Sequence, residues 1–127
     1  MNFVCKIDLT IYSCVSPDIT TDVVIITDER IRHIQSRHPL DYERYHEYIK
    51  SILEDPHYII EDNKPNTAFI LKEFVEDQQR FRLILRLHTT RDVPGRQNSI
   101  LTFQYIKERE YQRLIHNKKI LYSSPNL

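Results

Sequence analysis

The order of apolar and polar residues predicts two strands near the start of the chain. Residues 6–12 alternate in polarity, as a half-buried strand does. Residues 13–22 are rich in Ser, Thr, Asp and Pro, and predict a loop. The short apolar run Val23–Ile26 predicts a second strand that is more deeply buried.

Helical periodicity begins directly after this run. Thr27 is a suitable N-cap, because two acidic residues follow it in the first turn, where they favour the helix dipole. The predicted helix runs to His38 and ends at the proline that follows. A second helix is expected from about Asp41 to Asp55. Its apolar residues form one stripe: Tyr42, Tyr45, Ile49, Ile52 and Leu53.

From residue 58 the period changes from that of a helix to that of a strand. Four strands are predicted at 58–61, 67–74, 81–88 and 99–106, and the last turn between them contains Gly95, the only glycine. A final helix over 108–116 and a short strand at 120–122 follow. Sequential strands with short connections pair antiparallel. We therefore expect an α+β fold, with N-terminal helices packed on an antiparallel meander sheet of four or more strands.

The composition fits a single globular domain over residues 1–127. The chain is 40% hydrophobic and 28% charged, which supplies a core and is too apolar for a disordered chain. No apolar run is long enough to span a membrane, and the N-terminus has no signal-peptide pattern. We expect Cys5 and Cys14 to be reduced, and the protein to be cytoplasmic unless a phage or secretion system delivers it to another cell.

The net charge of zero conceals an asymmetry along the chain. Residues 1–79 contain 8 Lys and Arg against 15 Asp and Glu, whereas residues 80–127 contain 10 against 3. A basic second half favours a polyanionic ligand such as a nucleic acid. The alternative is that the two halves simply pair with each other across the fold.

The first predicted helix carries residues that can perform acid–base chemistry. Arg30, His33 and Arg37 are spaced to share one face, and His38 lies at the apolar edge where the helix ends. A histidine exchanges protons near neutral pH, and an arginine holds a phosphate. The alternative is a solvated basic face with one core histidine. The two histidines lie about 140° apart around the helix, so no metal site is predicted, and no other cofactor is expected.

Two predicted strands add polar side chains. The alternate polar set of strand 81–88 is Arg82, Ile84, Arg86 and His88. The corresponding set of the next strand is Asn98, Ile100, Thr102 and Gln104. Arg86 is a candidate phosphate contact, and its alternative role is a salt bridge to the acidic N-terminal half. Thr102 can hydrogen-bond a phosphate, although threonine is also an ordinary strand residue.

Short motifs in a fixed order resemble one known family. This is the phage-borne branch of the superfamily that groups barnase, EndoU, colicin-type and RelE-like ribonucleases, known as BECR. The most specific blocks are Arg37-His38-Pro39, Asn63-Lys64-Pro65-Asn66-Thr67 and Asn117-Lys118-Lys119-Ile120-Leu121-Tyr122. Further matching stretches are 26–34, 41–43, 61–67, 71–73, 83–87 and 98–100, so the resemblance covers nearly the whole chain. The last block alone also fits an ordinary helix C-terminus.

The resemblance implies a BECR-like fold and a metal-independent endoribonuclease directed at tRNA or another cellular RNA. A ribose hydroxyl attacks the adjacent phosphate and leaves a cyclic phosphate, while a base accepts one proton and an acid supplies another. The implied catalytic residues are His33, Arg37, His38, Arg86 and Thr102. The implied substrate-binding residues are Asn66, Asn98, Lys119 and Tyr122. Either histidine would act as base or acid, and the two arginines would hold the phosphate.

The biological role expected from the resemblance is that of a prophage effector or toxin, with an immunity or antitoxin protein as partner. Two other functions are alternatives. A non-catalytic nucleic-acid-binding phage accessory module would bind in a salt-dependent way and release no product. A protein-interaction domain would use its two charged halves to form an oligomer.

Overall fold

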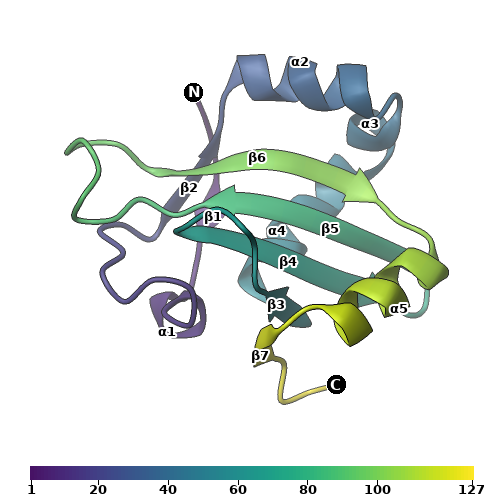
Figure 1. Cartoon of the computed structure of the whole chain (residues 1–127). Coiled ribbons are helices and arrows are strands. Elements are labelled where there is room, and N and C mark those ends of the chain that lie inside the picture. Colours follow the sequence, from purple (N-terminus) through teal and green to yellow (C-terminus); the bar gives the residue numbers. More distant parts are fainter.

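Residues 58–105 fold into the antiparallel meander that their alternating polarity predicts, and the residues before them add helices and two strands (Figure 1). The computed structural model describes all 127 residues. In chain order the elements are β1 (Asn2–Lys6), α1 (Leu9–Tyr12), β2 (Val23–Ile26), α2 (Asp28–Arg37), α3 (Asp41–Tyr45), the 3₁₀ helix η1 (His46–Tyr48), α4 (Ile49–Glu54), β3 (Tyr58–Ile60), β4 (Thr67–Phe74), β5 (Gln79–Arg86), β6 (Asn98–Tyr105), α5 (Glu108–Asn117) and β7 (Ile120–Ser123). The predicted α+β class is confirmed.

All strands belong to one sheet in the order β1-β2-β6-β5-β4-β3-β7. The pairs β3–β4, β4–β5 and β5–β6 are antiparallel, as short connections require. β2 is parallel to β6, but it pairs only with Asn98 and Ser99 at the start of that strand. The rest of the outer edge of β6 is flanked by α2 and α3, and the Tyr105 N–H donates to the Asp41 carboxylate at 3.2 Å.

The two faces of the sheet differ in chemistry. One face, here called the core face, packs with α1, α2 and α4 around 18 buried residues. Phe81, Leu83 and Leu85 of β5, and Leu87 directly after it, are fully buried there. The other face, here called the open face, is covered only in part by α5, which buries a smaller group of six residues. In Figure 1 α4 lies behind the sheet and α5 in front of it.

The predicted strand over 6–12 is wrong. The strand ends at Lys6, and residues Leu9–Tyr12 form the short helix α1. Asp8 is its N-cap and accepts from the Thr10 N–H at 2.9 Å. Tyr12 is fully buried, and its hydroxyl donates to the Leu53 carbonyl at 2.8 Å. This long-range contact outweighs the local alternation of polarity.

The predicted second helix is interrupted, although its apolar stripe is correct. The 3₁₀ turn His46–Tyr48 separates α3 from α4. Tyr45 and Tyr48 both contact Phe81, with ring centroids 5.2 and 5.0 Å apart. Side chains three residues apart align in a 3₁₀ turn, so this turn directs both rings onto the same core residue.

Phe81 is therefore the aromatic centre of the core face. We expect Phe81→Ala to lower the free energy of unfolding by about 3–5 kcal/mol, the usual cost of such a cavity. Phe3→Ala is the matched control, because Phe3 is 65% exposed, and should change stability by less than about 1 kcal/mol. Urea unfolding measures both variants, and equal losses would contradict this description of the core.

Candidate active site

The open face carries a row of polar side chains on its two central strands. Arg82 and Arg86 project from β5, and their register partners on β6 are Gln104 and Ser99. Thr102 lies between these two pairs. Directly opposed side chains have Cβ atoms about 4.5–5.5 Å apart, and the two arginines are about 13 Å apart along the strand. These five residues, here called the open-face row, form a polar floor with an arginine towards each end.

A β-bulge decides which residues of β6 reach this row. The register shifts after Ile84, which pairs with Thr102, so that Leu101 is left without a partner. Directly before the bulge in the chain, Ile100 points into the core and is fully buried. An extra residue in one strand reverses the alternation of faces. The predicted single face for Asn98, Ile100, Thr102 and Gln104 is therefore wrong.

His38 directly follows α2, the helix that flanks β6. The residue is the C-cap of the helix and is half-buried. Burial is the main cause that lowers its pKa from the ordinary 6.5; the charges of Arg82, Arg37 and His33 lower it further, against an opposing effect of Asp41. A neutral imidazole at neutral pH can accept a proton. The structure thus places Arg82, Arg37 and His33 within electrostatic range of His38.

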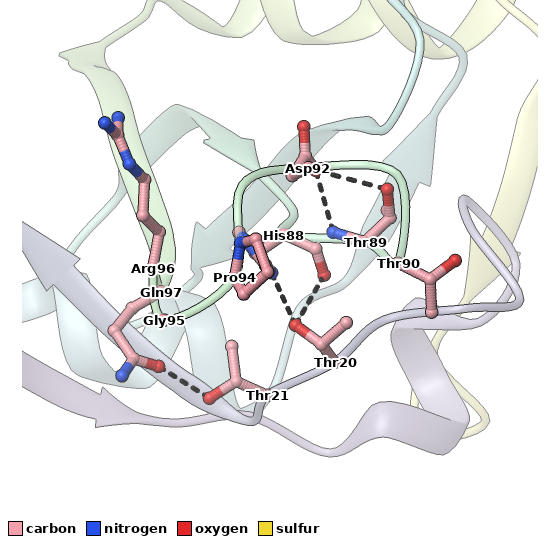
Figure 2. Close-up of a pocket in the computed structure, with 10 residues that line it drawn as sticks. All are labelled: Thr20, Thr21, His88, Thr89, Thr90, Asp92, Pro94, Gly95, Arg96 and Gln97. Atoms are coloured by element: carbon pink, nitrogen blue, oxygen red, sulfur yellow. Dashed lines mark hydrogen bonds between the residues drawn. The ribbon is translucent and has the colours of Figure 1, made fainter.

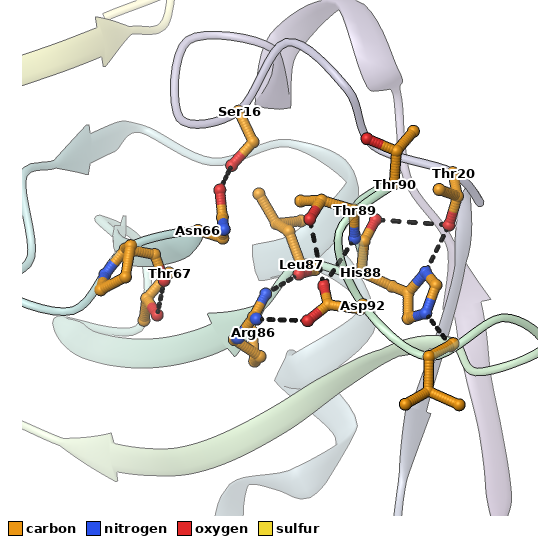
Figure 3. Close-up of polar contacts among 12 residues, drawn as sticks. Ser16, Thr20, Asn66, Thr67, Arg86, Leu87, His88, Thr89, Thr90 and Asp92 are labelled. Atoms are coloured by element: carbon orange, nitrogen blue, oxygen red, sulfur yellow. Dashed lines mark hydrogen bonds and ion pairs between the residues drawn. The ribbon is translucent and has the colours of Figure 1, made fainter.

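Arg86 is held in place by an acidic residue from the next loop (Figure 3). Its guanidinium donates to Asp92 at 2.8 Å and to the Leu87 carbonyl. Asp92 also accepts from the backbone N–H of Thr89, the largest cause that lowers the pKa of this carboxyl. The predicted alternative, a partner from the N-terminal half, is wrong. The Arg86 side chain is still 35% exposed. Asp92 therefore fixes its orientation while leaving it accessible to a ligand.

The loop between β5 and β6 encloses a polar pocket of about 330 Å³ (Figure 2). His88 lies buried beside it, beyond the end of β5. Its Nε2 lies 2.6 Å from the Val93 carbonyl and therefore donates, so Nδ1 accepts from the Thr20 hydroxyl at 2.5 Å. Both nitrogens are engaged, and His88 fixes the loop. Arg96 points away from this histidine in Figure 2.

The two predicted asparagines occupy different environments. Asn98 is fully buried, and its side-chain amide accepts from the His88 N–H at 2.8 Å. The same amide donates to the carbonyls of Thr21, before β2, and of Val23, the first residue of β2. Asn66 lies in the β3–β4 turn with a φ of 56°. Its side chain accepts from the Ser16 hydroxyl at 2.7 Å, and its carbonyl accepts from the Leu87 N–H. Asn66 is thus close to the Arg86 end of the row.

Lys119 and Tyr122 lie at the far end of the sheet. β7 is its last strand, and Tyr122 pairs in register with Ile59 and packs against the core of the opposite face. The Lys119 side chain is exposed just before this strand. The structure does not bring either residue to the open-face row.

Arg82 and Gln104 were not singled out from the sequence. The Arg82 guanidinium lies over the Phe69 ring, 5.8 Å from its centroid, and forms no ion pair. Its Nε and the Gln104 Oε1 are buried and have no hydrogen-bond partner. In the sequence, only the alternation that groups Arg82 with Arg86 pointed to Arg82. The lack of hydrogen-bond partners at Arg82 and Gln104 is visible only in the folded structure.

The acidic and basic halves of the chain hardly neutralise each other. Among five ion pairs, only that between Arg80 and Glu73, at 2.7 Å, joins the two halves. Seven cations of the second half have no ion-pair partner: Arg82, Arg91, Arg96, Lys107, Arg109, Lys118 and Lys119. Pairing across the fold therefore does not account for the asymmetry of charge.

Three further observations concern metals, thiols and membranes. No three His, Cys, Asp or Glu side chains converge in a way that could hold a metal ion. Both cysteines are free; Cys5 is buried and Cys14 exposed. None of the helices has the length and apolar character needed to cross a membrane.

Comparison with known proteins gave one match. Residues 7–123 match the model of a family described as phage-Barnase-EndoU-ColicinE5/D-RelE like nuclease2. No curated protein and no solved structure matches the chain. The family match spans most of the residues and confirms the resemblance seen in the short motifs.

Proposed function

Because the chain belongs to the phage-Barnase-EndoU-ColicinE5/D-RelE like nuclease2 family, we propose that it is a metal-independent endoribonuclease whose active site is the open-face row with His38. The family supports nuclease activity and a nucleic-acid substrate. The choice of RNA rests on the groups present: a histidine and arginines can promote attack by a ribose hydroxyl without a metal. The observation that carries the proposal is the half-buried His38 within electrostatic range of Arg82, whose Nε is buried without a partner.

Four residues act directly in the proposed reaction. His38 accepts the proton of the ribose 2′-hydroxyl, whose oxygen then bonds to the adjacent phosphorus. Arg82 stabilises the additional negative charge on the phosphate, and Thr102 donates a hydrogen bond to it. The bond from phosphorus to the 5′ oxygen breaks, and His33 supplies the proton that this oxygen takes. The products are a cyclic phosphate and a 5′-hydroxyl.

The flanking cations hold the neighbouring nucleotides. Arg86 and Arg37 contact phosphates on either side of the cleaved bond. Asn66, which lies next to the Arg86 end of β5, contacts the same RNA strand. The proposed site leaves out Asn98, whose amide is engaged within the fold. It also leaves out Lys119 and Tyr122, the residues at the far end of the sheet.

We extend the proposal to tRNA as substrate and to a role as prophage effector or toxin. The phage association of the family supports this role. An active ribonuclease made in the cytoplasm would attack the RNA of its own host. Such an enzyme needs an immunity or antitoxin protein that covers the open-face row until the enzyme is delivered.

Cleavage should be direct, metal-free and dependent on His38. We expect the purified protein to cut total tRNA into discrete fragments in EDTA, and His38→Ala to lower the rate about 10²- to 10⁴-fold, the usual contribution of a general base. His116→Ala is the control, because this exposed histidine lies in the last turn of α5. A denaturing gel measures the rates.

Two outcomes would contradict the proposal. Fragments from His38→Ala at the wild-type rate would remove His38 from the site. No fragments, with tRNA still shifted on a native gel, would indicate the non-catalytic binding module.

The protonation of His38 gives a second test. Its pKa should lie below the ordinary 6.5, so the base form predominates at neutral pH and is lost as the pH falls through that lower value. Arg82→Gln removes one positive charge that lowers this pKa and should shift the titration towards higher pH. NMR titration of the ring protons measures both proteins. A midpoint at or above 6.5 in the wild type would argue against His38 as the base.

A further inference from the structure

A second pocket lies where β6 passes into α5. It has a volume of about 420 Å³ and is lined by residues 104–107 and by Arg109, Glu110 and Arg113. We call it the β6–α5 pocket. Because Gln104 belongs both to this pocket and to the open-face row, the pocket continues the proposed active site towards α5.

The charge of the β6–α5 pocket is positive. Glu110 is its only carboxylate, and Arg113 donates to it at 2.9 and 2.5 Å. These hydrogen bonds are the largest cause that lowers the Glu110 pKa, and Arg82 lowers it further. Lys107 and Arg109 are exposed and form no ion pair. Two cations at the pocket therefore remain available to an anion.

Gln104, which lines this pocket, and Arg82, its neighbour on β5, present complementary groups. They are direct register partners on β6 and β5. The Gln104 Oε1 is a buried acceptor with no donor, and the Arg82 Nε is a buried donor with no acceptor. Buried polar groups nearly always have partners in folded proteins. The pair therefore fits a ligand that offers an acceptor and a hydroxyl donor close together, as a phosphate and the 2′-hydroxyl of a ribonucleotide do.

We propose that the β6–α5 pocket binds the ribonucleotide next to the cleaved bond. Lys107 and Arg109 contact its phosphate, and Gln104 accepts a hydrogen bond from its 2′-hydroxyl. The inference rests on the proposed function for the position of cleavage. It deepens that function, because Gln104 then selects RNA over DNA through binding, separately from the chemistry at His38.

Binding can be measured without cleavage in the full-length His38→Ala protein. The probes are a short fluorescent single-stranded RNA and the DNA of the same sequence, followed by anisotropy over a range of salt. Each phosphate contact contributes about 0.7 to the salt slope of single-strand binding. Because both side chains contact the same phosphate, Lys107→Ala with Arg109→Ala should reduce the slope by about 0.7. Lys6→Ala with Lys50→Ala removes two exposed lysines from β1 and α4 and should leave it unchanged.

Two substitutions at Gln104 test the selection of ribose. Gln104→Leu removes the acceptor and should lower the RNA-to-DNA affinity ratio about tenfold, since one hydrogen bond in a site has about this value. Gln104→Glu retains an acceptor, so it should keep the RNA-to-DNA affinity ratio. Its negative charge should weaken the binding of both probes. Thermal unfolding checks that each variant folds.

The outcomes separate this inference from the proposed function. A Lys107/Arg109 variant that binds like the Lys6/Lys50 control, or an unchanged ratio in Gln104→Leu, would overturn the inference even if the wild type cleaves RNA. The expected binding losses in a protein whose wild-type form cuts no RNA would support the pocket and overturn the proposed function alone.

Discussion

The pairing of β5 with β6 across the unpaired Leu101 is the constraint on which the candidate site depends. Before the bulge, Ile100 faces the core; after it, Thr102 and Gln104 face the opposite side of the sheet. One additional residue thus allows a single strand to contribute to the core and to the polar row. A regular strand would place Ile100 and Thr102 on the same face, and either the core or the row would lose a member.

The polar row is tolerated because α5 covers only part of the open face. Its apolar contacts lie over β3 and β4, where Phe69 and Leu71 are buried. Arg82 reaches the Phe69 ring at the border of this cover, and Arg86 is held by Asp92. Charged groups on a central strand are costly unless they meet solvent, a counter-ion or a ligand. Arg86 meets a counter-ion, whereas Arg82 has none. In the proposed complex the substrate phosphate is the counter-ion of Arg82.

Local signals in the sequence predicted much of this fold. Thr27 caps α2 as expected, accepting from the Arg30 N–H at 3.1 Å, and β4 has the predicted bounds Thr67–Phe74. These elements depend on residues close together in the chain. The parallel pairing of β2, the turn at His46–Tyr48 and the bulge at Leu101 depend on distant contacts that no local period records. The site divides in the same way: α2 and the alternation of β5 indicated His38 and Arg86, whereas the electrostatic effect of Arg82 on His38 depends on the folded structure.

The central claim, that the open-face row and His38 cut RNA through its ribose hydroxyl, is tested most directly with a DNA oligonucleotide that contains one ribonucleotide. Only the ribose offers the 2′-hydroxyl that His38 would deprotonate. We predict, in EDTA, a single cut on the 3′ side of that ribonucleotide, with a 5′-hydroxyl on the downstream fragment. Cutting at the deoxyribonucleotides, or a 5′-phosphate on the downstream fragment, would contradict the account.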